Sequence, residues 1–382
     1  MLAPPAKKVA AIVTEYRRLS HADVIVSRLL AGYHPNGVFT PPRVRVVSLY
    51  TDQVPANDMS RDLAVKHGFT IYPTVAGALT LGGSKLAVDG VLLIGEHGEY
   101  PTNERGQKLY PRFELFERIT EVFRASRRSV PVFCDKHLSY SWLKAKRMYD
   151  ESRELGFAFL AGSSLPATLR QPELELPLDC SLADAVAVGF GDKDAYGFHA
   201  LETLQCMVER RQGGETGVAA VQALEGGAVW EWRDSPAGRW SAPLLDAALA
   251  RSKRLKPGRP EDNAKAPILF LLEYRDGFRA AVYMLDGHTE DFLFAGQLRG
   301  RAEPAATLFS MYQRELLHFD GLVYEIEELF LTGRAPYAVE RTLLTTGALA
   351  FLLDSLYQRK RLATPELKIA YRAPARAWFE RS

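Results

Sequence analysis

The stretch Pro131-Val-Phe-Cys-Asp-Lys-His-Leu138 decides the fold, together with the helix and strand that follow it. An apolar strand is predicted over residues 130–134, and a helix rich in Lys, Arg and Glu over residues 141–155. A second apolar strand follows in residues 157–161. Because a strand, a helix and another strand in this order form a βαβ unit, this stretch predicts a parallel sheet.

Three polar residues follow the first of these strands: Asp135, Lys136 and His137. In an open parallel sheet, the residues at the carboxyl end of a strand line the crevice in which ligands bind. A lysine in that crevice can give a proton to a substrate hydroxyl or take one from it. Lys136 is therefore a candidate catalytic residue.

The same alternation of strands and helices extends back to the start of the chain. Strands are predicted over residues 8–14, 44–49 and 86–94, and helices over residues 21–33, 58–67 and 113–126. Gly68 stands where a glycine ends a helix. Residues 1–165 are therefore expected to form a Rossmann-like, doubly wound α/β domain with a nucleotide-binding crevice.

The pattern changes after residue 165, because strand-like runs now follow one another directly. These runs cover residues 217–232, 267–273, 278–285 and 291–298, and Tyr274-Arg-Asp-Gly277 is typical of a hairpin turn. Helices are predicted over residues 198–210, 306–331 and 338–359. We expect residues 166–382 to form an α+β domain with a mostly antiparallel sheet. Its last helix is a candidate to pack back on the first domain.

Composition excludes several classes of partner. The 382 residues carry a net charge of +2, which gives no general attraction to nucleic acid or to an anionic membrane. No stretch approaches the roughly 20 apolar residues of a transmembrane helix, and residues 1–8 lack the apolar region of a signal peptide. The three cysteines are scattered and odd in number, which argues against a disulfide framework. We expect a cytoplasmic protein.

Taken in order along the chain, these segments resemble the glucose–fructose oxidoreductase and inositol 2-dehydrogenase family (Gfo/Idh/MocA-like). The resemblance is strongest over residues 86–165 and is also readable over residues 266–360. The family carries Glu-Lys-Pro where this chain has Asp135-Lys136-His137, so the lysine matches and its neighbours differ. The segment 270–278 resembles the family's sheet hairpin, and residues 332–341 resemble the lead into its closing helix.

The resemblance implies a function as well as a fold. It implies an oxidoreductase of carbohydrate metabolism that acts on CH–OH groups of a sugar, cyclitol or related polyol. The implied cofactor is NAD or NADP, which receives or gives the hydride. For residues 166–382 the resemblance implies a substrate-binding and oligomerisation domain, with a large open sheet that has helices on one face only. In the family the open face commonly makes the subunit contacts, so the resemblance also implies a homo-oligomer, either a dimer or a tetramer.

A histidine of the second domain is the other catalytic residue that the resemblance implies. The family has Asp-x-x-x-His at the start of a helix, and here His199 fits that position. The residue four places earlier is Ala195, although Asp192 and Asp194 lie beside it. In the family this histidine faces the substrate and the catalytic lysine, so we expect His199 and Lys136 to share the proton transfer.

The first turn departs from the dinucleotide-binding pattern. Gly-x-Gly-x-x-Gly is expected there, because glycines let the backbone approach the pyrophosphate at a helix N-terminus. The chain instead reads Thr14-Glu-Tyr-Arg-Arg-Leu-Ser-His21, with no glycine. Three interpretations stay open: Arg17 and Arg18 hold phosphates by their side chains, another ligand or binding mode fills the crevice, or the turn is purely structural in a protein that has lost the cofactor.

Further cofactor candidates follow the second and fourth strands. Asp52 stands where an acid often meets the adenosine ribose, although it is also an ordinary turn residue. The loop Gly95-Glu-His-Gly-Glu99 suits a divalent metal, an acid/base pair or a plain hydrogen-bonded loop. The candidate cofactor-binding residues are Tyr16, Arg17, Arg18, Asp52, Glu96, His97 and Asp135.

Two other function classes remain open. A non-redox lyase, hydratase or isomerase, assisted by a metal or by acid/base groups, would use Glu96, His97 and Glu99, with His21 and His137 in the same crevice. A non-catalytic relative that binds a ligand would use the crevice without its chemistry, because a fold does not fix a function.

Overall fold

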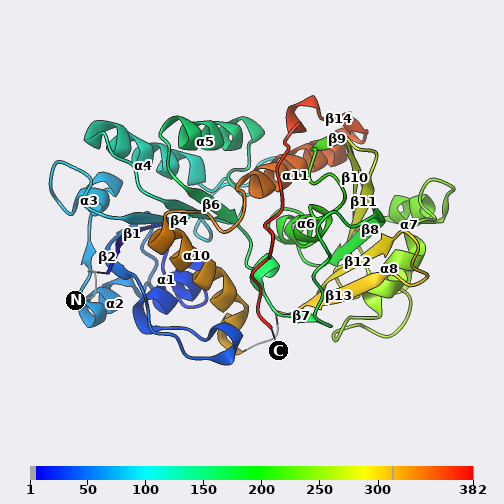
Figure 1. Ribbon diagram of the computed structural model, residues 1–382, viewed down its shortest axis with the longest axis horizontal. Coiled ribbons are helices and arrows are strands. Elements are labelled where there is room, and N and C mark those ends of the chain that lie inside the picture. The colour runs from blue at the N-terminus through cyan, green and yellow to red at the C-terminus, as the bar shows by residue number, and fades with distance from the viewer. Residues whose placement is uncertain (1–5, 312–313, 382) are drawn as a thin grey trace. The chain divides into compact units, whose positions relative to one another are not determined.

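The computed structural model describes residues 6–311 and 314–381, which divide into two compact units. Unit 1 contains residues 6–101, 108–164 and 314–339 (Figure 1). Unit 2 contains residues 102–107, 165–311 and 340–381. Each unit is thus built from segments that lie far apart in the sequence.

Unit 1 holds a parallel sheet of six strands in the order β3-β2-β1-β4-β5-β6. Every neighbouring pair in it is parallel, which confirms the predicted doubly wound sheet. The strands are β1 (Lys8–Val13), β2 (Arg45–Thr51), β3 (Thr70–Ile71), β4 (Gly90–Ile94), β5 (Val132–Asp135) and β6 (Phe159–Gly162).

Helices cover both faces of this sheet. Figure 1 shows α4 and α5 on one face and α1 and α10 on the other. The helices of unit 1 are α1 (His21–Ala31), α2 (Ser60–His67), α3 (Val75–Thr80), α4 (Arg112–Ser126), α5 (Trp142–Glu154) and α10 (Asp320–Thr332), with short 3-10 helices η1 (Pro35–Gly37) and η3 (Arg314–Phe319).

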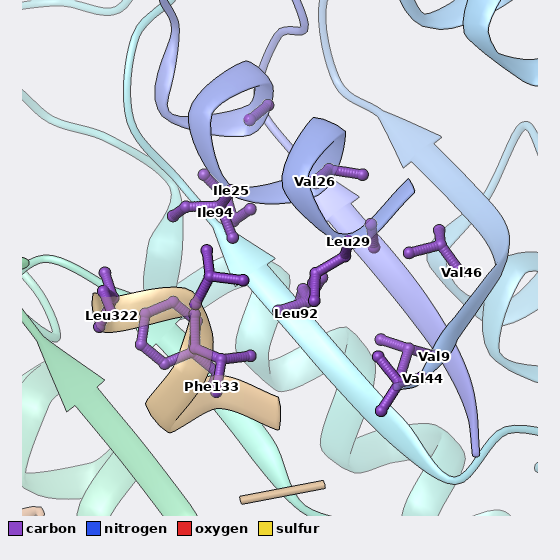
Figure 2. Close-up of a cluster of buried hydrophobic side chains, with 14 of the residues drawn as sticks. Val9, Ile25, Val26, Leu29, Val44, Val46, Leu92, Ile94, Phe133 and Leu322 are labelled. Carbon is purple, nitrogen blue, oxygen red and sulfur yellow. The ribbon is translucent and has the colours of Figure 1, made fainter. Parts of the chain in front are cut away.

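The core between α1, α10 and the sheet is continuous and apolar (Figure 2). Ile25 of α1 and Leu322 of α10 meet Leu92, Ile94 and Phe133 of the strands, and all five are buried. Full burial of each such side chain contributes about 1.5–3 kcal/mol. Helix α10 therefore belongs to this unit, although β6 ends at Gly162, α10 begins only at Asp320, and most of the sequence between them belongs to unit 2.

Unit 2 holds a sheet of eight strands in the order β14-β9-β10-β11-β8-β12-β13-β7. The pair β8 and β11 is parallel and the other neighbouring pairs are antiparallel, which confirms the predicted mostly antiparallel sheet. The strands are β7 (Arg170–Gln171), β8 (Leu182–Gly189), β9 (Val218–Glu225), β10 (Ile268–Tyr274), β11 (Arg279–Met284), β12 (Phe292–Leu298), β13 (Ala305–Phe309) and β14 (Leu362–Ala363).

Helices cover both faces of the second sheet as well. On one face, Gly189 of β8 approaches Ala200 of α6, while on the other Val186 and Val188 pack with Leu245 of α8. The expectation of helices on one face only is therefore wrong for this chain, because the segment after β9 forms α7 and α8 and packs on the face opposite α6. The helices of unit 2 are α6 (Ala195–Val208), α7 (Gly227–Asp234), α8 (Ala242–Leu249), α9 (Pro260–Asn263) and α11 (Glu340–Gln358), with short 3-10 helices η2 (Leu165–Ala167) and η4 (Pro365–Leu367).

Two predicted elements of this half are wrong. The strand-like run over residues 217–232 stops at Glu225, because Gly226 turns the backbone with a φ of +63° and α7 follows. A single helix is predicted over residues 306–331. The structure instead has strand β13 at the start of this range, and helix α10 begins only at Asp320. Ala305–Phe309 pairs with β12, so the cross-strand contacts override the helical spacing of its apolar residues.

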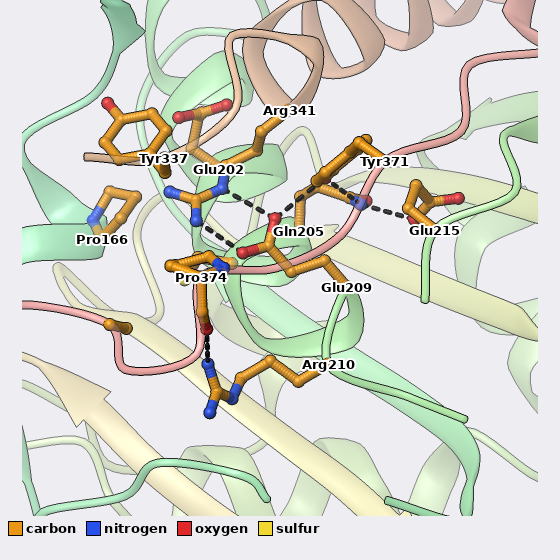
Figure 3. A network of polar contacts seen from close by, with 12 residues as sticks. Pro166, Glu202, Gln205, Glu209, Arg210, Glu215, Tyr337, Arg341, Tyr371 and Pro374 are labelled. Atoms are coloured by element: carbon orange, nitrogen blue, oxygen red, sulfur yellow. Dashed lines mark hydrogen bonds and ion pairs between the residues drawn. The ribbon is translucent and has the colours of Figure 1, made fainter. Parts of the chain in front are cut away.

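A buried polar network ties the C-terminal segment to α6 and α11 (Figure 3). Arg341 Nε donates to Glu209 Oε2 at 2.8 Å, and both residues are buried. The Tyr371 hydroxyl donates to the same carboxylate at 2.9 Å and accepts from Gln205 Nε2 at 2.9 Å. Burial raises the pKa of Tyr371, so the hydroxyl stays protonated and available as a donor.

Replacement of Tyr371 by phenylalanine is expected to lower the free energy of unfolding by about 2 kcal/mol, because a hydrogen bond to a buried charged group is lost. Urea denaturation of the full chain measures the change. Tyr357→Phe is the matched control, since that hydroxyl bonds Glu104 at the surface and the side chain is 57% exposed. Equal denaturation midpoints for Tyr371→Phe and the wild type would contradict this role of the network.

Within residues 6–311 and 314–381, none of the helices combines the length and the apolar character needed to cross a lipid bilayer.

Candidate functional site

The candidate site lies in unit 1, at the carboxyl ends of β1, β4 and β5. These three strands are neighbours in the sheet, and the strand order reverses between β1 and β4. Ligands of open α/β sheets bind at such a reversal. The sheet therefore brings together the loops that follow Val13, Ile94 and Asp135.

Three non-glycine residues in these loops adopt left-handed backbone conformations. The φ angles are +60° at Leu19, +71° at His97 and +67° at Lys136. Each such residue stores strain of order 1–3 kcal/mol, which persists where the surroundings enforce it and which clusters at functional sites. At Lys136 the backbone is fixed by the N–H, which donates to the Gly162 carbonyl at 3.0 Å.

Lys136 belongs to a buried ionic cluster with Glu96, Arg112 and His137. Its Nζ lies 3.6 Å from Glu96 Oε1, and Arg112 contacts the other oxygen of the same carboxylate. Arg112 Nη1 also donates to His137 Nε2 at 3.3 Å. Lys136 is 3% exposed and Arg112 is fully buried, so the cluster is shielded from bulk water.

The charges in this cluster follow from its geometry. Burial alone would raise the pKa of Glu96, but Lys136 and Arg112 outweigh that effect and hold this pKa well below its ordinary value. Burial, assisted by Arg112, lowers the pKa of His137. Glu96 is therefore an anion between two cations, and His137 is a neutral acceptor.

Replacement of Glu96 by glutamine is expected to lower the free energy of unfolding by about 3 kcal/mol near neutral pH, because two buried cations lose their partner. The pKa of Glu96 is lower in the folded chain than its ordinary value of 4.5, so its stabilisation is complete above pH 4.5 and is lost as the pH falls below it. The difference between wild type and variant should shrink below that pH.

Urea denaturation near neutral pH and again below pH 4.5 measures both values. Glu117→Gln is the control, because Glu117 pairs with Arg147 in a partly exposed ion pair on the same unit. A difference for Glu96→Gln that stays constant over this pH range would contradict the assignment of Glu96 as a buried anion.

A second cluster joins the loops after β1, β4 and β5. His21, the first residue of α1, lies with Nδ1 2.6 Å from Asp135 Oδ2. Its backbone N–H donates to His97 Nδ1 at 3.3 Å, and the two imidazole rings lie 5.2 Å apart. Burial lowers the pKa of His97 to about 4, so this ring is neutral near pH 7.

These contacts account for the Glu96, His97 and Glu99 loop. Glu96 is neutralised by Lys136 and Arg112, and His97 uses Nδ1 to accept a backbone N–H. The backbone of Glu99 exchanges hydrogen bonds with the Gln53 side chain. Among the residues that the structure describes, no group of three or more His, Cys, Asp or Glu side chains is arranged to hold a metal ion.

The glycine-free turn after β1 is closed by its own hydrogen bonds. Ser20 caps α1 and accepts from the Asp23 N–H at 3.3 Å, while the Leu19 N–H donates to the Asp23 carboxylate at 2.9 Å. Tyr16 is fully buried, and its hydroxyl lies 2.8 Å from Ser27 Oγ. Together with the His21 bond to His97, these contacts occupy amides that a glycine-rich turn would offer to a pyrophosphate.

The two arginines of this turn point to different surroundings. Arg17 is about one third exposed and pairs with Glu15 at 2.6 Å, beside a cavity of about 500 Å³. Arg18 is exposed and lines a second cavity of about 320 Å³ with Asp23 and Arg28. The first cavity is lined by Glu15, Arg17, Gln53, Val54, Pro55, Asn57, Gly98 and Glu99.

Asp52 lies at the end of β2 and connects two tyrosines. It accepts the hydroxyl of Tyr50 at 2.9 Å and that of Tyr100 at 2.7 Å. Burial and this aspartate raise the pKa of Tyr100, which keeps the donor protonated. Asp52 itself remains exposed.

His199 lies in unit 2, in the first turns of α6. Its ring is flanked by Tyr196 at 6.1 Å and by Phe292 at 5.9 Å. Asp192 accepts the backbone N–H groups of Asp194 and Ala195 and so caps the helix start. The nearby aspartate therefore holds the helix that carries this histidine.

Sequence reasoning missed Arg112 as a member of the site. It is the first residue of α4, and it carries the contacts to both Glu96 and His137. An arginine at a helix start ordinarily lies on the surface, so the sequence offers no local signal for its burial.

No family model matches the sequence, and no protein with a curated function matches it. Solved structures match over nearly the whole chain. The myo-inositol 2-dehydrogenase of Lactobacillus plantarum is 10% identical, with a TM-score of 0.56, over 94% of this chain and 99% of that one.

Two other matching structures were solved with a nicotinamide cofactor. The biliverdin reductase of Synechocystis, in complex with biliverdin and NADP+, is 14% identical with a TM-score of 0.50, covering 91% of this chain and 98% of that one. GenD2 from gentamicin A biosynthesis, in complex with NAD, is 14% identical with a TM-score of 0.53, covering 95% and 99%.

These likenesses confirm the fold that the sequence resemblance implies. Both sheets, in their order along the chain, match the two-domain fold of Gfo/Idh/MocA oxidoreductases. The matching structures include a dehydrogenase and a reductase, and the two that were solved with a cofactor hold NADP+ or NAD.

The residues present fit such a cofactor in part. The closed turn offers few free amides to a pyrophosphate, so a glycine-rich cradle is absent. The cavity beside Arg17 lies at the ends of β1, β2 and β4, and it combines an arginine with carboxylate and amide side chains. Such groups bind phosphate and ribose hydroxyls. The fit therefore depends on side chains.

Proposed function

We propose that this protein is an oxidoreductase of the Gfo/Idh/MocA type that uses NAD or NADP to oxidise or reduce a CH–OH group of a sugar, cyclitol or related polyol. The observation that carries the proposal is the position of Lys136 in the sheet. This lysine follows β5 at the carboxyl edge of the sheet, with a strained backbone and a carboxylate partner 3.6 Å away. The fold of the matching dehydrogenases supports it.

The proposed cofactor contacts use side chains of the glycine-free turn and of the neighbouring loops. Arg17 and Arg18 would hold phosphates, and Asp52 would meet a ribose hydroxyl. Tyr16 contributes from within the core by fixing the turn through Ser27. Glu96, His97 and Asp135 complete the proposed binding edge. A bound nicotinamide supplies the hydride acceptor or donor.

The chain's own residues handle the proton. The Lys136 ammonium lies against Glu96, which fixes its position at the edge of the crevice. A lysine there can donate a proton to a substrate oxygen or recover one from it. We propose His199 of unit 2 as the second catalytic residue, held by the capped start of α6.

A screen of sugars, cyclitols and related polyols with NAD+ and with NADP+ tests the proposal. Reduced nicotinamide is followed by its fluorescence, with the full chain and with His199→Asn. The proposal expects at least one polyol to reduce one of the cofactors, and His199→Asn to slow that reaction. The proposal would be contradicted if no polyol were oxidised with NAD+ or NADP+ and no corresponding carbonyl compound were reduced with NADH or NADPH.

The closed turn favours a second candidate, which is a non-redox lyase, hydratase or isomerase on this scaffold. The His21 N–H is already bonded to His97, and Ser20 and Asp23 occupy further amides of the turn. The ionisable groups of the crevice would then act on a substrate without a nicotinamide. Loss of water or isomerisation of a polyol by protein that binds no nicotinamide would support this candidate.

A further inference from the structure

His21 and Asp135 form a carboxylate–imidazole pair that the proposed roles of Lys136 and His199 leave unused. The two residues lie 114 positions apart in the sequence, and Nδ1 of His21 is 2.6 Å from Oδ2 of Asp135. The Asp135 side chain is 1% exposed, whereas the His21 side chain is 13% exposed. One partner is thus buried and the other is partly exposed.

This geometry fixes the proton on the imidazole. A carboxylate accepts the Nδ1–H of His21, which leaves Nε2 as the basic nitrogen of the neutral ring. A buried carboxylate in this position also stabilises the imidazolium that forms when Nε2 takes a proton. The pair therefore has the arrangement of a general base, His21, that is oriented by the carboxylate of Asp135.

The surroundings of His21 favour its use over the other histidines of the crevice. The groups that face it are Asp135 from β5, Glu96 and His97 from the loop after β4, and the Phe319 ring from η3 at 5.1 Å. His97 is held neutral with a pKa of about 4, and burial lowers the pKa of His137 as well. Neither of these two rings takes up a proton near neutral pH.

We infer that His21 and Asp135 form a proton-transfer dyad at the carboxyl edge of the sheet. A substrate hydroxyl gives its proton to His21 Nε2, which breaks the O–H bond and forms an N–H bond, and Asp135 balances the new positive charge. In the reverse direction His21 returns the proton to the substrate oxygen. The inference rests on the proposed function in placing the substrate in this crevice.

The dyad complements Lys136. Lys136 is 3% exposed and lies against Glu96, within a buried cluster. His21 is more open to solvent and can exchange its proton with water after each turnover.

Diethyl pyrocarbonate tests the dyad in the full chain without a known substrate, because it acylates neutral imidazole nitrogens that it can reach. Mass spectrometry of peptides measures the rate at each histidine over a range of pH. His34 is an exposed reference and His137 is a buried one. We expect His21 to react at a rate close to that of His34 and faster than His137.

The Asp135→Asn variant then probes the pair itself. At alkaline pH, loss of the negative charge should slow the modification of His21 relative to that of His34, because the carboxylate no longer stabilises the positive charge that forms when Nε2 attacks the reagent. If this variant does not fold, the rates in the wild type alone decide the question. His21 reacting as slowly as His137 would overturn the dyad, whatever the cofactor does.

Addition of NADH separates the dyad from the proposed function. Modification of His21 that NADH slows supports both. Modification of His21 in a protein that shows no NADH binding by fluorescence supports the dyad and contradicts the nicotinamide-dependent function.

Discussion

Replacement of Arg112 by alanine is expected to lower the free energy of unfolding by about 3–5 kcal/mol. The guanidinium is fully buried and contacts Glu96 and His137. Its removal leaves a buried carboxylate with one cation, Lys136, at 3.6 Å, and leaves His137 Nε2 without this donor. An uncompensated buried charge is the reason for the size of the loss.

Packing adds to this effect. The Arg112 side chain lies so close to Gly95 that a Cβ at that position would come within 2.5 Å of the arginine Cγ. Alanine would therefore leave a cavity beside the backbone at the end of β4, and a cavity in a buried site adds to the loss of stability.

Urea denaturation of the full chain measures the change in stability. Arg128→Ala is the matched control, because Arg128 is half exposed and pairs with Asp89 at 3.2 Å on the same unit. The control should lose less than about 1 kcal/mol. A loss for Arg112→Ala no larger than that of the control would contradict the buried cluster.

Replacement of Lys136 by methionine is expected to lower turnover about 100- to 10,000-fold, because a positioned acid–base group contributes a factor of that size. Methionine keeps most of the apolar part of the side chain but cannot carry a proton. Glu96 loses one of its two cations, while Arg112 remains in contact with it. Turnover should therefore fall far more than NADH binding does.

The comparison uses a polyol that the cofactor screen has identified. Lys144→Met is the control, because Lys144 of α5 pairs with Glu114 of α4 and is about 30% exposed. Circular dichroism and an NADH titration show whether each variant is folded and binds the cofactor. Oxidation that continues in Lys136→Met at a rate within about threefold of the wild type would remove Lys136 from the catalytic role.

Much of the fold is predictable from local pattern. Buried parallel strands such as β4 read as continuous apolar runs, and Gly68 ends α2 with a φ of +71° as expected. The errors arise where long-range pairing decides the structure. Strand β13 carries apolar residues that suit a helix, and β8, rich in alanine with Asp184 within it, gives no strand signal despite lying inside the second sheet.

The site is predictable in outline only. The rule that strand ends line the crevice finds Lys136, Glu96 and Asp135, because it depends on strand order alone. It cannot find Arg112, whose burial depends on the tertiary packing of α4. The sequence also shows that glycines are missing after β1, but only the structure shows that His97 accepts the amide of His21.

The central claim is that the chain binds a nicotinamide dinucleotide. Titration of NADH and NADPH into the purified full chain tests this claim most directly. Fluorescence and calorimetry follow the wild type, Arg17→Ala and Arg18→Ala, with Arg45→Ala, an exposed arginine at the start of β2, as control. The account predicts saturable binding of at least one cofactor by the wild type and the control, weakened in Arg17→Ala or Arg18→Ala. If the wild type bound neither NADH nor NADPH saturably, the account would be contradicted.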